Sequence, residues 1–279
     1  MQPSEGTLTG QGGLKLFYRL WEPDQVKGSL LLVPGAGEHG GRYEHVAAWF
    51  VSQGLAVWAM DHRGHGRSEG DRMHIDRFDQ YVADLHAFVQ LAAARHGKPV
   101  MVGHSMGGLI AYHYAVAHPD AIRGLVLSSP WFRNRAEPTG VQKLLLPALS
   151  VLVPRARLKG ALPPEACHRN PEFLARDRSD PLRPGSFTPR WFSECVKAAA
   201  ACHSSMSFPS ELPVFFLVSG TDHLLIPEAA RAVFDRIQSR RKAFRFYPER
   251  YHELFNDPGY EEVFADLLAW LRAEGLAPA

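Results

Sequence analysis

A serine flanked by glycines follows a short apolar run in the middle of the chain. Gly103, Ser105 and Gly107 form a G-x-S-x-G pattern, with apolar residues 99–102 before it and a helix-like run, 109–118, after it. The order strand, sharp turn, helix is typical of a nucleophile elbow, where glycines leave room for the turn and the serine hydroxyl is lifted clear of the sheet. We therefore expect Ser105 to be a nucleophile, although so short a pattern also arises by chance.

A serine hydroxyl needs a general base to take its proton, and the base needs an acid that fixes its tautomer. Asp222 lies in the short polar segment after the apolar run 214–218, and His252 lies in the one after the run 244–247. The carboxyl ends of parallel strands meet at one edge of a sheet, where ligand sites form. We expect Asp222 to be the acid and His252 the general base and later general acid, with Glu228 and Asp257 as alternatives for the acid.

The negative charge that develops on the attacked carbonyl oxygen needs two backbone N–H donors. The amide of Met106, directly after Ser105, is expected to be one of them. The second is expected from the loop after residues 29–33. There the glycine-rich segment 35–37 allows the backbone to approach closely, and we choose Ala36.

The elements that would hold these residues alternate between strands and helices. A glycine-rich turn first predicts a hairpin over residues 7–21. Apolar runs then predict buried strands, with helical spacing between them, at residues 29–33, 56–60, 99–102, 124–128, 214–218 and 244–247. This alternation indicates βαβ units and an α/β fold with a parallel sheet covered on both faces.

The alternation stops at Pro130 and resumes at Val214. Residues 131–211 are rich in proline, arginine and short helix-like pieces, without a run typical of a buried strand. We expect residues 1–130 and 212–279 to form the core, and residues 131–211 to form a cap inserted between two strands of one sheet.

Bulk composition excludes several classes of protein. The chain has 279 residues, 46% of them hydrophobic, and a net charge of +2, which does not favour a nucleic-acid partner. Three cysteines, Cys167, Cys195 and Cys202, are too few and too scattered for a disulfide framework or a zinc site. The longest apolar stretch, 144–153, is shorter than the ~20 residues of a membrane span. We expect a cytoplasmic protein without a metal or nucleotide cofactor.

Several motifs in combination resemble the monoacylglycerol lipase and lysophospholipase-like family of the α/β hydrolases; they stand at residues 35–39, 42–43, 61–68, 103–108, 180–182, 220–222 and 251–253. The resemblance implies a mostly parallel sheet of about eight strands flanked by helices, with an inserted helical cap. It also implies a serine hydrolase of lipid esters with the triad Ser105, Asp222 and His252. The sequence departs from the family at Pro34, where a histidine is usual.

The expected cap suggests how an apolar substrate would enter the site. Val141, Leu144, Leu145, Leu149 and Leu152 recur at helical spacing, which predicts a helix that packs on the core, lines an acyl-chain tunnel or docks on a membrane interface. Residues 133–190 contain 11 Lys and Arg against 5 Asp and Glu, a surplus of six positive charges. Such a surface would suit an anionic membrane or a phosphate-bearing lipid, although a solvated charged face is the more ordinary explanation.

The function that the resemblance implies is hydrolysis of a monoacylglycerol to glycerol and a fatty acid, and the expected nucleophile would carry it through an acyl-enzyme on Ser105. A lysophospholipase or a broad carboxylesterase is the first alternative. An amidase resembling the prolyl aminopeptidases, or a non-catalytic binding protein of the same fold, is a more distant one.

Overall fold

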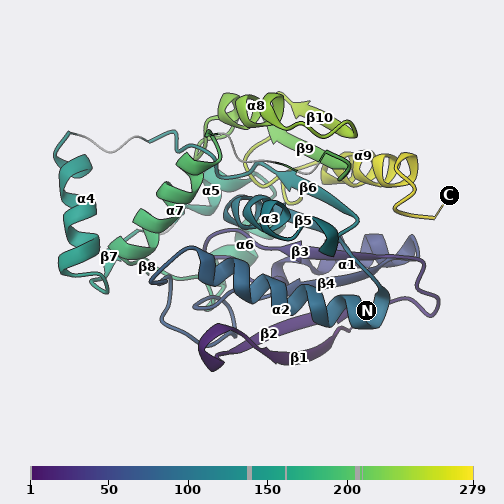
Figure 1. The fold of residues 1–279 in the computed structure, drawn as a ribbon, viewed down its shortest axis with the longest axis horizontal. Helices are drawn as coiled ribbons and strands as arrows, with labels where there is room; N and C mark the ends of the chain where they lie inside the picture. Colours follow the sequence, from purple (N-terminus) through teal and green to yellow (C-terminus); the bar gives the residue numbers. More distant parts are fainter. Residues whose placement is uncertain (1, 137–139, 161, 205–207, 209, 279) are drawn as a thin grey trace.

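An eight-stranded sheet forms the centre of the computed structural model (Figure 1). The structure describes residues 2–136, 140–160, 162–204, 208 and 210–278, with the backbone alone for residues 141–144. The strands lie in the order β1 (Ser4–Thr9), β2 (Lys15–Trp21), β4 (Ala56–Met60), β3 (Ser29–Val33), β5 (Val100–His104), β6 (Gly124–Ser128), β9 (Val214–Ser219) and β10 (Lys242–Tyr247). The strands predicted from the apolar runs are confirmed.

Six neighbouring strands, from β4 to β10, are parallel, whereas β1 and β2 pair antiparallel at one end of the sheet. β5 lies between β3 and β6, so the G-x-S-x-G turn leaves the middle of the sheet. This position is consistent with the continuous apolar run of β5, because a central parallel strand is buried on both of its faces.

Two hydrophobic layers cover the two faces of the sheet. Leu31, Met101 and Leu127 point to the layer that includes α2 (Asp79–His96), α3 (Met106–Ala117) and α8 (Pro227–Arg236). The residues that alternate with them along the strands point to the layer that includes α1 (Glu44–Ser52) and α9 (Tyr260–Ala273). Figure 1 shows α2 and α3 in front of the sheet. The fold is therefore the three-layered α/β arrangement that the sequence predicts.

Residues 131–211, which we call the insert, lie between the end of β6 and the start of β9. The insert contains α4 (Gly140–Leu152), α5 (Pro164–Cys167), α6 (Pro171–Ser179) and α7 (Pro189–Ala201). It also contains the two-residue strands β7 (Leu158–Lys159) and β8 (Ser186–Phe187), which pair with each other. α4 packs beside α7 and stands apart from the sheet, at the left of Figure 1.

The helix predicted over the apolar repeat of the insert is present as α4, with Pro147 inside it. Leu145 and Leu152 of this repeat are exposed, so this part of the helix does not pack on the core. The side chains of Val141 and Leu144 lie outside the described residues. Among the helices that the structure describes, none combines the length and the apolar character needed to cross a bilayer.

Candidate active site

Ser105 occupies a sharp turn between β5 and α3. Its backbone has φ 52° and ψ −117°, a conformation that side chains rarely adopt. The glycines on either side make the turn sterically feasible. A Cβ on Gly107 would overlap the carbonyl oxygen of Val33, and one on Gly103 would lie 2.5 Å from the carbonyl oxygen of Gly107. The geometry matches the nucleophile elbow expected from the sequence.

Asp222 and His252 lie in the loops after β9 and β10, and the structure brings them together. The Nδ1 of His252 and the Oδ2 of Asp222 are 2.7 Å apart, and both side chains are buried. The other carboxylate oxygen accepts hydrogen bonds of 2.8 Å from the amides of Leu224 and Leu225. An ionised carboxylate accepts only, so the imidazole donates from Nδ1 and its Nε2 is left free to accept a proton.

Of the two alternative acids, Asp257 is engaged by other groups and Glu228 is exposed. Asp257 is fully buried and accepts hydrogen bonds from the Arg169 guanidinium and the Tyr251 amide. Glu228 lies in the first turn of α8 and is exposed. Asp222 is therefore the carboxylate that contacts His252 in this structure.

Burial and the attraction between the two side chains shift the pKa values of His252 and Asp222. Burial alone would lower the pKa of His252, but the charge and hydrogen bond of Asp222, assisted by Glu253 and Glu38, raise it above 6.5. Burial alone would raise the pKa of Asp222, but its contacts with His252 and two backbone amides lower it. The carboxylate is thus ionised at neutral pH and holds an imidazole of increased basicity.

Ser105 and His252 both line a cavity of about 320 Å³ beneath the insert. Ala36 and Gly37, from the loop after β3, line the same cavity. Met106 begins α3, and the first amides of a helix have no acceptor within the helix. Of the two residues expected to donate to an oxyanion, Ala36 thus shares the cavity wall with Ser105, and Met106 follows Ser105 at the start of α3.

Aromatic side chains of the insert form much of the remaining cavity wall. Trp131, Phe187, Trp191 and Phe192 line the cavity, and their rings pack against one another with centroids 5.7–6.1 Å apart. The backbone amide of Trp131 donates a hydrogen bond of 3.0 Å to the carbonyl oxygen of Ser105. The start of the insert is therefore fixed directly to the predicted nucleophile.

A buried cluster of charges that the sequence did not reveal lies behind the cavity. The Arg42 guanidinium contacts three carboxylates: Glu38 of its own loop, Asp177 of α6, and Glu253, which follows His252. Glu38 also accepts a hydrogen bond of 2.6 Å from the Gly35 amide. Arg42 thereby connects the loop of Ala36, the loop of His252 and the insert.

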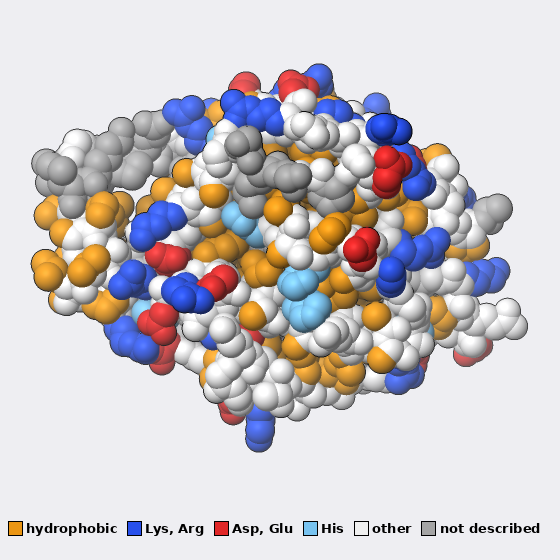
Figure 2. All heavy atoms as spheres, in the orientation of Figure 1, with side chains coloured by type: hydrophobic (Ala, Val, Ile, Leu, Met, Phe, Trp, Pro, Cys, Tyr) orange, Lys and Arg blue, Asp and Glu red, His pale blue; other side chains and the backbone are white. Residues whose placement is uncertain are grey.

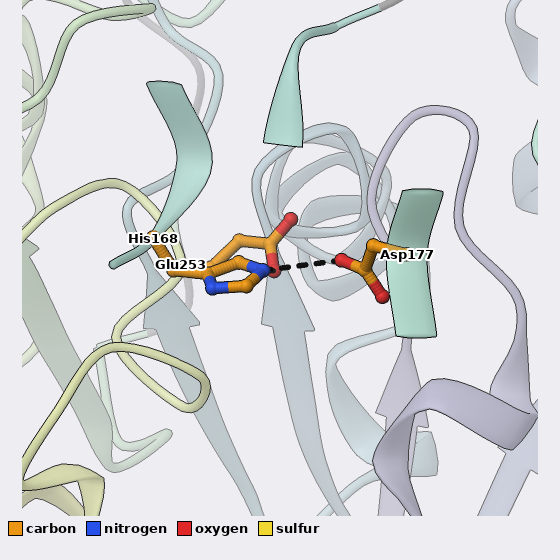
Figure 3. Close-up of side chains that lie close together, drawn as sticks. All are labelled: His168, Asp177 and Glu253. Carbon is orange, nitrogen blue, oxygen red and sulfur yellow. Dashed lines mark hydrogen bonds and ion pairs between the residues drawn. The ribbon is translucent and has the colours of Figure 1, made fainter. Parts of the chain in front are cut away.

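His168, Asp177 and Glu253 of this cluster are close enough to act as metal ligands, and their side chains converge in Figure 3. Arg42 already donates to both carboxylates, and Arg183 lies 3.2 Å from Asp177. The positive charge that these carboxylates need is therefore supplied by arginines of the chain itself. We assign the group to the ion network that joins the insert to the core.

A further link between the insert and the core was also not predicted from the sequence. His39 and Asp180 lie 2.8 Å apart, although 141 positions separate them in the sequence. The available signal was the presence of His39, Arg42 and Asp180 within the short motifs at residues 35–43 and 180–182. Nothing in their spacing indicated that they would meet.

A strained serine at the end of a central parallel strand, with a buried His–Asp pair after two later strands, defines a serine hydrolase of the α/β-hydrolase fold. The profile of the family described as "Serine aminopeptidase, S33" matches residues 24–259. The chain belongs to this family.

Curated relatives cover nearly the whole chain. A monoacylglycerol lipase of Mycolicibacterium smegmatis is 32% identical over 271 residues, which are 96% of each protein. The human monoglyceride lipase is 31% identical over 272 residues, covering 95% of this chain and 89% of the human protein. The crystal structure of a Paleococcus ferrophilus monoacylglycerol lipase superposes with a TM-score of 0.82 at 27% identity, covering 98% and 100% of the two chains.

Proposed function

We propose that this serine hydrolase cleaves monoacylglycerols to glycerol and a fatty acid. The observation that carries the proposal is the cavity at Ser105 and His252, whose wall is largely apolar and aromatic. Such a wall suits the acyl chain of a lipid ester, since burial of each methylene is favourable by about 0.8 kcal/mol. The named activities of relatives that align over nearly the full chain agree with this substrate class.

In the proposed reaction Ser105 Oγ attacks the ester carbonyl carbon while His252 Nε2 takes the hydroxyl proton. Asp222 holds the imidazole in the required tautomer and stabilises the imidazolium that forms. The amides of Ala36 and Met106 donate to the oxyanion of the tetrahedral intermediate. The intermediate collapses to an acyl-enzyme as the glycerol oxygen leaves with the proton of His252.

The second half-reaction uses the same groups in reverse roles. His252 takes a proton from a water molecule, and the resulting hydroxide attacks the acyl-enzyme carbonyl. Collapse of the second tetrahedral intermediate returns the proton to Ser105 Oγ and releases the fatty acid.

The cavity lining favours an ester of a neutral or anionic lipid over the amino terminus of a peptide. A protonated amino terminus is held by carboxylates, and the described lining residues include neither Asp nor Glu. Arg183 does line the cavity, with its side chain 16% exposed. This cation makes lysophospholipids, which bear a phosphate, the second candidate substrate class.

The test is a comparison of kcat/KM for monoacylglycerols, lysophospholipids and aminoacyl amides under one assay condition. We expect the monoacylglycerol to be hydrolysed fastest, and a fluorophosphonate to label the wild type but not Ser105→Ala. The proposal fails if the folded protein cleaves the amide in preference, or if Ser105→Ala is labelled and remains active.

We further propose that residues 131–211 act as a cap whose tip contacts membranes peripherally. Leu145, Val151 and Leu152 of α4 are 51%, 67% and 78% exposed, and Figure 2 shows hydrophobic side chains gathered over α4 at the left of the molecule. Arg155, which contacts Asp71, and Arg157 follow shortly after α4, and both are exposed. An apolar tip beside positive charge suits an anionic bilayer surface.

Sedimentation with lipid vesicles tests the membrane contact. We expect binding to increase with the fraction of anionic lipid and to fall by several-fold in Val151→Asp/Leu152→Asp. The equivalent change at exposed Val26, on the core, serves as the control and is expected to leave binding unchanged. Equal binding by both variants would contradict the proposal.

A further inference from the structure

A second cavity lies next to the catalytic one, between α4 and α7. Its volume is about 570 Å³, and the catalytic cavity shares three of its lining residues, Trp131, Asn134 and Phe192. Side chains found only in the second cavity include Phe132, Leu146, Val151 and Val196, which are apolar. The two cavities are therefore neighbours with a common wall, and the second one is a suitable environment for hydrocarbon.

Trp131 and Phe192 of the common wall differ in how firmly they are held. Trp131 is held to Ser105 by its backbone amide and is 6% exposed. Trp191, which packs on Trp131, donates a hydrogen bond of 3.0 Å from Nε1 to the hydroxyl of Tyr81. Phe192 is half-buried and packs on the rings of Trp131 and Phe187. Phe192 is more exposed than the two tryptophans, and it lines both cavities.

The size of the catalytic cavity makes an extension necessary for long acyl chains. Its 320 Å³ stands at the lower end of the roughly 300–1,000 Å³ typical of small-molecule sites. The same space must accommodate the head group beside Ser105 and the first part of the acyl chain. A chain of medium length would fill what remains, so the distal methylenes of a long chain must lie elsewhere.

We propose that the second cavity binds the distal part of long acyl chains, which reach it past Phe192. The inference rests on the proposed function, since it concerns the substrate of the same site. Phe192 is then the residue that determines chain-length preference. Val196 lies one helical turn after Phe192 in α7 and lines only the second cavity, so it would contact a chain that has passed Phe192. Each methylene accommodated there is expected to raise kcat/KM by up to about fourfold.

The experiment measures kcat/KM for octanoyl and stearoyl monoacylglycerols in mixed micelles of fixed composition. Val196→Trp fills the second cavity from an exposed position, and its ratio of stearoyl to octanoyl activity is expected to fall at least tenfold. Phe192→Ala widens the wall, and its ratio is expected to rise. Val153→Trp adds the same ring at another exposed valine of the insert that lines neither described cavity, and its ratio is expected to match the wild type.

The outcomes separate the inference from the proposed function. If Val196→Trp slows both substrates by the same factor, the second cavity lies on an access route instead, and the inference is overturned. An unchanged ratio in Val196→Trp also overturns it. If the wild type hydrolysed neither monoacylglycerol, the proposed function itself would be refuted. Thermal melting of each variant by circular dichroism shows that a changed ratio comes from folded protein.

Discussion

The Nη2 of Arg42 donates a hydrogen bond of 2.8 Å to the Oε2 of Glu253, the residue that follows His252. The same guanidinium contacts Glu38 and Asp177, and its side chain is 2% exposed. Contact with this cation outweighs burial and holds the pKa of Glu253 well below 4.5. One buried arginine thus links carboxylates from the core, the insert and the loop of the proposed general base.

Arg42→Met is expected to destabilise the fold by about 3–5 kcal/mol, because it leaves buried carboxylates without their cation. Urea denaturation followed by tryptophan fluorescence measures the loss. The matched control is Arg231→Met, which removes an exposed arginine paired with exposed Asp235. We expect that variant to unfold close to the wild-type midpoint. Equal midpoints for the two variants would show that the cluster contributes nothing to stability.

Asp222→Asn is expected to lower kcat about 10⁴-fold with little change in KM, because an amide can donate to Nδ1 and so stabilise the wrong tautomer of His252. Steady-state kinetics with one monoacylglycerol provides the measurement. Glu228→Gln removes the alternative acid of α8 and is expected to retain wild-type activity. If Glu228→Gln lost most of its activity while Asp222→Asn kept it, Glu228 and not Asp222 would be the acid.

The pH dependence of kcat/KM is expected to show an acidic limb with its midpoint above 6.5. His252 acts as a base only when it is neutral, and its pKa is raised by Asp222 despite burial. Activity is therefore lost as the pH falls through this raised pKa. Burial lowers the pKa of His62 to about 4 and that of His65 to about 3, so neither titrates in the same range. A midpoint below 6 would contradict the assignment of His252.

Gly107→Ala is expected to destabilise the protein by about 3 kcal/mol or to prevent folding, because its Cβ would overlap backbone atoms that cannot move independently. Gly185→Ala provides the control, since no heavy atom lies within 4 Å of the Cβ that it would add. Thermal denaturation compares the two. A Gly107→Ala variant as stable as Gly185→Ala would mean that the turn relaxes without strain.

The sequence predicted the sheet and the positions of Ser105, Asp222 and His252 at its edge because these features are local. A buried parallel strand is a continuous apolar run, and each site residue lies within five residues of the end of such a run. β5 and the turn at Ser105 could be read from ten consecutive residues. The assignment of Ser105, Asp222 and His252 to catalytic roles stays a prediction until the variants are measured.

The arrangement around Arg42 could not be predicted because it depends on contacts between distant segments. Arg42 and Glu253 are separated by 211 positions, and Arg42 and Asp177 by 135. Asp84 was also missed, since helical periodicity places it among buried apolar residues, where it pairs with Arg63 at 2.6 Å. The exposure of the apolar side chains of α4 could not be predicted either. An apolar repeat indicates that a helix has an apolar face, but it does not indicate what covers that face.

The insert leaves the sheet after β6 and returns at β9, and these strands are paired in register from Leu125 with Val214 to Ser128 with Leu217. Because these strands are parallel, the insert leaves at the carboxyl edge of the sheet and returns at its amino edge, and the pairing of the two strands fixes both attachment points. Each doubling in length of a connection between fixed points costs only about 0.6 kcal/mol of closure entropy. The segment over the site can thus be exchanged for one of different length while the catalytic strands stay in place. In evolutionary terms, replacement of the insert can change the range of substrates while the core stays the same.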